Sequence, residues 1–258
     1  MADPVIVHAE PVMGTVVSFH VVAGGLAAER IHAAIRDAAA LLHRHDELFS
    51  TWRPESPMSR LRRGELELGD APSEIAEVLE LCAQARSLSG GWFDAAAMPG
   101  GVDPTGLVKG WSAEAALALL ARAGVDAAMV NAGGDIACLG SPPGGGSWKI
   151  GIRHPWRADA LACVIAVDAA IATSGEYERG RHLVDPPGRQ GRRPASATVT
   201  GPSCALADAL ATALAVGGDD AFASVAAIEG YDAYLIGTDG TERSTAGIRF
   251  VDAGGTRA

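Results

Sequence analysis

Residues 203–218, SCALADALATALAVGG, form the most informative segment of the sequence. Ala and Leu dominate it, Ser203 can cap its start and a Gly-Gly pair can end it, so we expect a helix. Asp208 and Thr212 interrupt the apolar run at positions i and i+4, which puts a carboxylate and a hydroxyl on the same helix face. Such hard oxygen ligands could hold Mg²⁺ against a phosphate. The alternative is that Asp208 lies on a solvated edge of the helix and that Thr212 only packs.

The sequence around this segment contains runs of strands broken by long helices. Hydrophobic periodicity predicts helices over 27–48 and 73–88, after Trp111 to about Ala123, and near 219–229. Because there is no regular strand–helix–strand alternation, we expect an α+β fold with a mostly antiparallel sheet and packed helices. No linker or shift of composition divides the chain, so we expect residues 1–258 to form a single globular unit. Strands are expected at two stretches of 4–22 flanking the turn Met13-Gly14-Thr15, into Asn131, and near 135–139, 148–153, 162–167, 169–173, 196–200, 232–237 and 247–251.

Composition and charge narrow the functional class. The 258 residues carry 31 acidic and 21 basic side chains, and the net charge of −10 argues against a general affinity for nucleic acid or anionic membranes. The four cysteines are scattered among apolar neighbours without a CxxC pair, as is typical of reduced core thiols. The N-terminal residues lack the basic and apolar regions of a signal peptide, and no later stretch resembles a membrane span. We therefore expect a cytoplasmic protein.

Two glycine-containing segments are candidates for ligand binding. Residues 101–110, GVDPTGLVKG, have two glycines five apart as in a P-loop, but Leu107 stands where lysine is required and no Ser or Thr follows Lys109, so we reject that motif. A Gly turn, Lys109 and a helix start remain, which suits a phosphate, or equally a turn capped by Asp103. Residues 131–135, NAGGD, follow an apolar strand. Their glycines would let a ligand approach the backbone, although the same residues also form common tight turns.

His182 is the best-placed general base among the seven histidines, because small polar and acidic residues surround it rather than the apolar stripe of a helix. A purely structural role for this histidine is the alternative. His43 and His45 do not predict a metal pair, since positions i and i+2 of a helix point to different faces. The chain has no GxSxG motif, so the sequence does not indicate a Ser-His-Asp hydrolase.

Taken together and in order, these segments resemble the ApbE family, the FAD:protein FMN transferases. The resemblance extends from near the N-terminus to about residue 218, and eight motifs in the order of the family are hard to obtain by chance. The matching residues are Met13-Gly-Thr15, Phe49-Ser-Thr-Trp-Arg-Pro54, Gly91-Trp-Phe-Asp94, Asp103-Pro-Thr-Gly-Leu-Val-Lys-Gly110, Asn131-Ala-Gly-Gly-Asp135, Ala172-Thr-Ser-Gly175 with Tyr177, His182-Leu-Val-Asp-Pro186 and Ala207-Asp-Ala-Leu-Ala-Thr212.

The resemblance implies a T-fold-like α+β enzyme that splits FAD at its pyrophosphate, attaches the FMN half through a phosphoester to a Ser or Thr of an acceptor protein, and releases AMP. By similarity, Asp208, Thr212 and the backbone carbonyl of Gly106 hold Mg²⁺, which would stabilise charge on the leaving AMP. His182 would deprotonate the acceptor hydroxyl. The residues that line or shape the FAD site by the same similarity are Met13, Trp52, Trp92, Phe93, Asp94, Asp103, Lys109, Asn131, Gly133, Gly134, Asp135, Ser174 and Val184.

The sequence departs from the family pattern in three places. Three alanines and a short connection follow Asp94, where relatives often continue with Pro-Thr and a longer insertion, which changes the expected FAD wall over 95–102. Trp52 replaces the more usual tyrosine, and either ring could stack on a flat heteroaromatic system. The N-terminal cysteine signal of exported relatives is absent.

Other functions stay open on the sequence alone. Hydrolysis of FAD to FMN and AMP would need the same metal, base and pocket as the transfer. A non-catalytic FAD-binding or delivery protein is a further alternative, but it would have no need to keep His182, Asp208 and Thr212 together. A nucleotide-binding module of unrelated function is the least specific possibility.

Overall fold

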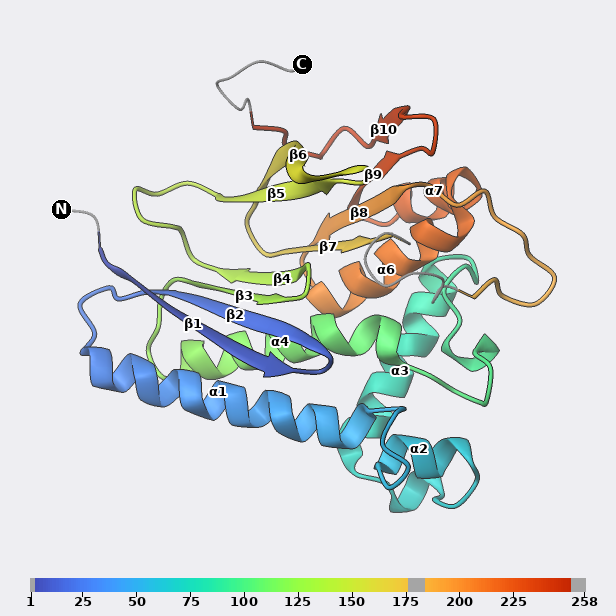
Figure 1. The fold of residues 1–258 in the computed structure, drawn as a ribbon, viewed down its shortest axis with the longest axis horizontal. Coiled ribbons are helices and arrows are strands. Elements are labelled where there is room, and N and C mark those ends of the chain that lie inside the picture. The colour runs from blue at the N-terminus through green and yellow to red at the C-terminus, as the bar shows by residue number, and fades with distance from the viewer. Residues whose placement is uncertain (1–2, 176–183, 252–258) are drawn as a thin grey trace.

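The computed structural model describes residues 3–175 and 184–251. Its centre is an eight-stranded sheet in the order β1-β2-β3-β4-β7-β8-β9-β10, in which all neighbours pair in antiparallel fashion. Helices α1, α4 and α6 lie along one face of this sheet, and a separate two-stranded sheet, β5 and β6, packs over the other face (Figure 1). The expected α+β fold with a mostly antiparallel sheet is therefore confirmed.

The elements have the following bounds. The strands are β1 Val5–Val12, β2 Thr15–Val22, β3 Ala128–Ala132, β4 Asp135–Leu139, β5 Trp148–His154, β6 Arg157–Val167, β7 Ala170–Ser174, β8 Ser196–Gly201, β9 Asp232–Ile236 and β10 Glu242–Ser244. The helices are α1 Ala28–Phe49, α2 Pro57–Arg62, α3 Ser73–Leu88, α4 Thr105–Arg122, α6 Cys204–Gly217 and α7 Asp219–Ala226, with short 3-10 turns η1 Leu68–Asp70 and η2 Ala95–Ala97. In the part of the chain that the structure describes, no helix has the length and apolarity to cross a bilayer.

Helix α6 is the central helix of the fold, and every one of its residues except Thr212 is buried. Ser203 caps it as expected, because its hydroxyl accepts a hydrogen bond from the amide of Leu206 at 3.3 Å. Glu114 of α4 completes the cap by accepting from the amide of Cys204 at 2.8 Å. Gly218, with a φ of 53°, ends the helix. The sequence thus predicted this helix and its two ends correctly.

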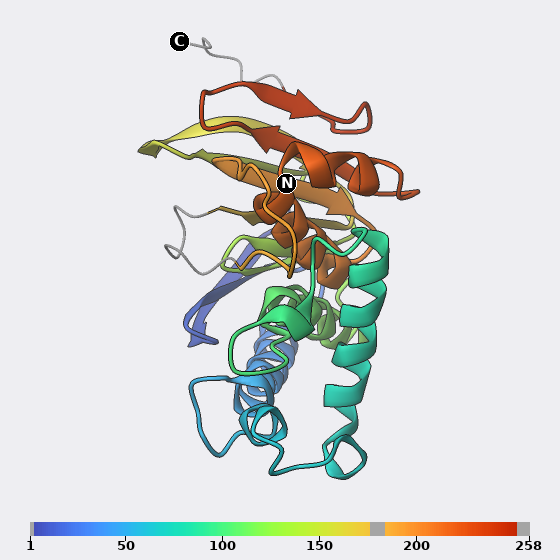
Figure 2. The same cartoon turned by 90° about the vertical axis from the view of Figure 1, so that its right-hand side faces the viewer.

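Helices α4 and α6 cross in unusually close contact at Gly110. A Cβ atom at this position would overlap the backbone carbonyl of Cys204, so only glycine allows the two helices to approach this far. The approach brings the first turns of α4 against Asp208 on α6. Helix α3 stands at one end of this helical layer (Figure 2).

Helix α4 starts earlier than the sequence predicted. It begins at Thr105 rather than after Trp111. Its first residues, TGLVKG, contain two glycines, which lower intrinsic helix propensity and make the segment resemble a loop. Packing against α6 overrides this weak propensity. The short helix α2 was not predicted; Ser56 caps it, accepting from the amide of Ser59 at 3.0 Å, and Pro57 occupies its first turn.

The prediction of a strand over 247–251 was wrong. The last strand of the main sheet is β10, which pairs with β9. Asp232 accepts hydrogen bonds from the Thr245 hydroxyl at 2.6 Å and the Gly247 amide at 3.1 Å, which turns the chain away from β9 after β10. Residues 247–251 then run beside β6 with a single bridge between Ile165 and Phe250.

Candidate functional site

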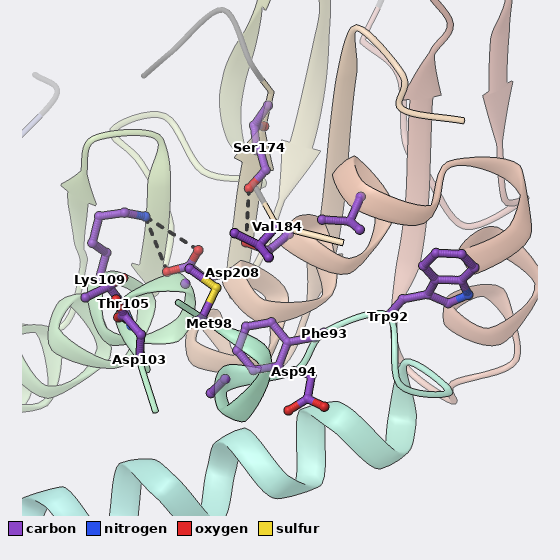
Figure 3. Close-up of a pocket in the computed structure, with 15 residues that line it drawn as sticks. Trp92, Phe93, Asp94, Met98, Asp103, Thr105, Lys109, Ser174, Val184 and Asp208 are labelled. Atoms are coloured by element: carbon purple, nitrogen blue, oxygen red, sulfur yellow. Dashed lines mark hydrogen bonds and ion pairs between the residues drawn. The ribbon is translucent and has the colours of Figure 1, made fainter. Parts of the chain in front are cut away.

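A cleft of about 770 Å³ opens between the start of α4, the middle of α6, the end of β7 and the segment before α4 (Figure 3). Most of the residues that line it are site residues expected from the sequence, although they come from distant parts of the chain. The lining residues are Trp92, Phe93, Asp94, Ala95, Met98, Asp103, Thr105, Gly106, Lys109, Thr173, Ser174, Val184, Asp208, Thr212 and Val216.

Asp208 is buried, with 1% of its surface exposed, and its partners come from α4. The amide of Gly110 donates to Asp208 Oδ2 at 3.1 Å, and Lys109 Nζ lies 3.5 Å from Oδ1 and 3.4 Å from Oδ2 (Figure 3). The sequence around Asp208 offers no basic residue, so its cation had to come from another element. The buried charge of Asp208 is thus compensated by a residue that is distant in the sequence and that the fold brings close.

Lys109 lies between two buried carboxylates. Its ammonium donates a hydrogen bond to Asp135 of β4 as well as contacting Asp208. One ammonium therefore serves two carboxylates, which leaves the cluster with a formal charge of −1 when all three groups are ionised. Burial and then repulsion by Asp135 raise the pKa of Asp208, while Lys109 and the Gly110 amide act to lower it. A second cation at Asp208 would relieve this repulsion.

Thr212 and Gly106 provide oxygens next to Asp208. Thr212 lies one turn after Asp208 on α6, and its Oγ1 is 3.5 Å from Ser174 Oγ. A Cβ added to Gly106 would come within 3.5 Å of the same Oγ1 atom, so the start of α4 lies directly against Thr212. Regular helical geometry directs the Gly110 amide to the Gly106 carbonyl, and the same amide also donates to Asp208, so the Gly106 carbonyl and the Asp208 carboxylate lie close to one amide.

This set of oxygens fits a hard divalent cation. A carboxylate, a hydroxyl and a backbone carbonyl are the donor types that Mg²⁺ accepts alongside water and phosphate. Within residues 3–175 and 184–251, no three His, Cys, Asp or Glu side chains are grouped as metal ligands. Among the described residues, Asp208 is the buried carboxylate that could serve as the charged ligand of a cation in the cleft.

Aromatic side chains form one wall of the cleft. Trp92 and Phe93 are 9% and 4% exposed, respectively. The Phe93 amide donates to Ser89 Oγ at 3.0 Å, and the guanidinium carbon of Arg189 lies 4.8 Å from the centre of the Trp92 ring. These contacts fix the wall in place, so it offers an apolar surface for a flat or hydrophobic part of a ligand.

Two acidic residues at the rim shape the short segment 95–103 rather than pointing free carboxylates at a ligand. Asp94 caps η2 by accepting from the Ala96 amide at 2.9 Å and also accepts from Arg86 Nε at 2.8 Å. Asp103 accepts from the Thr105 amide at 3.0 Å and from Arg62 Nη1 at 3.1 Å. Their hydrogen bonds define the path of the shortened connection between the aromatic wall and α4.

A second groove, of about 1180 Å³, lies between the main sheet and β5, and it shares Thr173 with the cleft. Asn131, Gly133 and Gly134, which the sequence placed near the FAD wall, line this second groove instead of the cleft. Asn131 Oδ1 accepts a hydrogen bond from the Gly134 amide at 2.8 Å, so the residues also form the tight turn that was the alternative interpretation.

Three other predicted site residues lie away from the lining of the cleft. Asp135 is buried behind Lys109. Met13 occupies the β1–β2 turn with a φ of 56°, and Trp52 is 93% exposed on the loop after α1. His182 lies outside the described residues, so its proposed role as a base stays a prediction.

The cleft has further lining residues that the sequence motifs did not predict as site residues. Ala95, Met98, Thr105, Thr173 and Val216 line the cleft. Ala95, Met98 and Val216 are apolar and carry no sequence signal of a site, whereas Thr105 and Thr173 lie within motifs that the sequence had already singled out. Arg62 was also missed; it ties α2 to the rim by donating to the Pro99 carbonyl at 2.7 Å as well as to Asp103. Thr173 could have been found from its position one residue before Ser174.

The chain belongs to the ApbE family, whose profile matches residues 13–100 and 99–235. It is 36% identical over 141 residues to the FAD:protein FMN transferase of Rhodobacter capsulatus, with 51% of this chain and 27% of the relative covered. It is 35% identical over 137 residues to the protein of the same name from Vibrio cholerae serotype O1, with 48% and 41% covered. The matches thus span less than half of the length of these two relatives. A Treponema pallidum protein of the same name is 28% identical over 318 residues, with 93% and 87% covered.

Solved structures of ApbE proteins share the fold. The flavin transferase ApbE from Vibrio cholerae superposes with a TM-score of 0.77 at 22% identity, covering 95% of this chain and 98% of that one. The ApbE protein from Thermotoga maritima gives a TM-score of 0.80 at 21% identity, covering 94% and 97%. The expected family and fold are therefore confirmed.

Proposed function

We propose that this protein transfers FMN from FAD to a Ser or Thr hydroxyl of an acceptor protein and releases AMP, with Mg²⁺ as the metal. The observation that carries the proposal is the cluster of Asp208, Thr212 and Lys109 in one cleft beside the aromatic wall of Trp92 and Phe93. Such a cleft offers charge neutralisation for a pyrophosphate and an apolar surface for a ring system in the same cavity. The names of the curated relatives support the same reaction.

The chemistry needs positioning and charge neutralisation more than covalent work by the enzyme. The acceptor oxygen would attack the phosphorus of the FMN half, the bond from that phosphorus to the bridging oxygen would break, and AMP would leave with the bridging oxygen and its electron pair. The proton of the acceptor hydroxyl would pass to His182. Lys109 would offer its ammonium to the pyrophosphate, and Asp135 would keep it oriented. Bound Mg²⁺, held by Asp208, Thr212 and the Gly106 carbonyl, would supply Lewis-acid stabilisation of the leaving phosphate.

The remaining predicted residues have distinct proposed roles. Trp92 and Phe93 would contact the FAD ring systems, while Asp94 and Asp103 would keep the rim in shape. Trp52 is exposed on the loop after α1 and would be available to stack on a flat ring of the ligand. Met13 would support the site from the β1–β2 turn, and Ser174 and Val184 would line the side next to β7. We expect the protein in the cytoplasm, where its acceptor would be cytosolic or face the cytosol. Cell fractionation tests this location.

The proposal is tested by incubating the protein with FAD and Mg²⁺ and measuring AMP with and without candidate acceptors that carry a Ser or Thr. Acceptor-dependent AMP release, with a mass gain of one FMN on the acceptor, is the expected result. We expect Asp208→Ala to reduce turnover by about 100-fold or more, because it removes the charged metal ligand. Asp220→Ala, at an exposed acidic position on α7, is the control and should retain activity.

Two outcomes would favour another function. AMP release that does not need an acceptor would identify an FAD hydrolase. Tight FAD binding without AMP release, unaffected by Asp208→Ala or His182→Ala, would identify a carrier and would contradict both catalytic assignments.

A further inference from the structure

Strand β5 has one unpaired edge, and that edge faces the second groove. β5 pairs with β6 along one side, and within residues 3–175 and 184–251 no other strand pairs with it. Four consecutive residues of β5, from Ile150 to Arg153, line the groove. An unpaired strand edge presents a row of backbone amide and carbonyl groups, which is the surface that an extended peptide uses to join a sheet.

The walls of the groove suit a polypeptide backbone better than a small polar ligand. Four glycines line it, at positions 14, 133, 134 and 151, and leave backbone accessible where side chains would otherwise stand. Isoleucines from β4, β5 and β7 form its floor. Arg153 is the single charged residue among those lining the groove, and it is exposed and forms no ion pair with any described residue.

The groove meets the cleft beside the point where the pairing between β4 and β7 ends. β4 and β7 pair only through Ile136–Ile171 and Ala137–Ala170, whereas β7 pairs with β8 along all of Ala170–Ser174. Past Ile171 the two strands no longer form ladder pairs, and Thr173 at this position lines both cavities. A side chain of a segment lying in the groove could therefore reach the cleft beside Thr173.

We propose that the acceptor polypeptide docks in this second groove as an extended strand on the free edge of β5, with an acidic side chain near its Ser or Thr facing Arg153. The inference rests on the proposed function, because only a transfer reaction needs a protein as second substrate. Backbone pairing with β5 provides affinity for an extended segment, and Arg153 selects the charge next to the modified residue. FAD occupies the cleft on the other side of Thr173 in this arrangement.

The test uses two pools of synthetic, proline-free peptides, each with one central Thr and random flanks, that differ only in Asp or Lys two residues from the Thr. FMN transfer to each pool is measured by mass spectrometry at sub-saturating peptide, with FAD and Mg²⁺ in excess. The wild type should modify the Asp pool faster than the Lys pool. Arg153→Glu should reverse this preference by on the order of tenfold while FAD binding, measured by flavin fluorescence, stays unchanged.

The matched control is Lys149→Glu. Lys149 is exposed on the same face of β5, undergoes the same charge change and does not line the groove, so this variant should keep the wild-type preference. A second probe tests the strand pairing: methylating alternate backbone nitrogens on one edge of the best Asp peptide should reduce transfer, and methylating those on the opposite edge should not.

Each other result has a defined meaning. If Arg153→Glu and Lys149→Glu share the wild-type preference, or if methylation on both edges is tolerated, the groove is not the docking site. Wild-type AMP release without transfer to any peptide would identify a hydrolase and overturn the docking proposal. Absence of both FAD binding and AMP release would instead overturn the proposed function.

Discussion

Lys109 is the residue on which the charge balance of the cleft depends. Its ammonium is shared by Asp135 and Asp208, which are both 1% exposed and come from different elements. An ion pair of this kind is expensive to bury, and removing one partner leaves the others uncompensated. Because Asp208 is also the proposed metal ligand, Lys109 and a divalent cation compete for the same carboxylate, while Asp135 holds Lys109 back from it.

This competition predicts opposite effects of two substitutions on metal affinity. Lys109→Met removes the competing cation and should tighten Mg²⁺ binding by about tenfold or more, since two buried carboxylates then face the metal alone. Asp135→Asn removes a negative charge and leaves Lys109 with Asp208 as its only charged carboxylate partner in the cluster, so it should weaken binding by a similar factor. Titration calorimetry with MgCl₂, in the absence of FAD, measures both.

The control for charge alone is Lys149→Met, at the only other lysine of the chain, which is exposed on β5. It should leave Mg²⁺ affinity unchanged. If Lys109→Met and Asp135→Asn shift the affinity in the same direction, competition between Lys109 and the metal is excluded.

At the scale of elements, the sequence predicted those helices and strands whose local pattern agrees with their packing. The β1–β2 pair, α1, α3 and α6 were predicted within a residue or two of their observed bounds. The errors fall where long-range contacts determine the secondary structure. The glycine-containing start of α4 is helical because it packs on α6. The exposed residues of β10 form a strand because they pair with β9. Neither contact can be inferred from a local window of sequence.

The same distinction applies to the site. The Asp208–Thr212 pair follows from helical spacing and needed no tertiary information. The partner of Asp208 is Lys109, 99 residues earlier, and no periodicity in the sequence connects them. The sequence correctly predicted that Asn131 to Gly134 lie at the end of a β-strand. It could not predict that they line the second groove rather than the cleft, because this depends on how β5 packs over the main sheet.

Contact between α4 and α6 predicts a contrast between two glycines of the same helix. Gly110→Ala should destabilise the protein by about 3 kcal/mol, because the added methyl group meets the backbone of Cys204, which cannot rotate away. Gly106→Ala is the matched control: its Cβ would come within 3.2 Å of Phe93 Cε2, a side-chain atom that can shift. Its stability should stay within about 1 kcal/mol of wild type, helped by the higher helix propensity of alanine.

Urea unfolding followed by circular dichroism measures both variants. Equal destabilisation by the two substitutions would show that helix flexibility, rather than the α4–α6 contact, explains the need for glycine at position 110.

At the scale of the whole molecule, the main sheet separates two cavities and the helical layer supports them. The cleft and the second groove meet beside the point where the pairing between β4 and β7 ends, and both depend on the sheet keeping its position over α1, α4 and α6. Stability of the helical layer is therefore a condition for both proposed substrate sites. One buried titratable group in that layer, His45, gives the stability a defined pH dependence.

His45 of α1 is 2% exposed, lies against the Trp111 ring with centroids 4.3 Å apart and is hydrogen-bonded through Nδ1 to Ser112 Oγ at 2.9 Å. Burial lowers the pKa of His45 from 6.5 to about 4, an effect only partly offset by Glu74. Because this pKa is lower in the folded state, the unfolded chain binds the proton first as pH falls. The neutral histidine thus contributes its full stability above pH 6.5, and the contribution is lost progressively between pH 6.5 and 4.

We therefore expect the free energy of unfolding to fall by up to about 3 kcal/mol between these pH values on account of His45 alone. His45→Gln keeps a polar partner for Ser112 but cannot titrate, so its unfolding free energy should show a shallower slope over this range, whatever its absolute stability. His32→Gln, at an exposed position of the same helix, is the control and should keep the wild-type slope. Urea unfolding at half-unit pH steps measures the unfolding free energy of all three proteins. Identical slopes for wild type and His45→Gln would mean that the α1–α4 interface admits a charged His45 without cost. Any loss of stability in acid, and with it any weakening of the two cavities, would then have to come from other titratable groups.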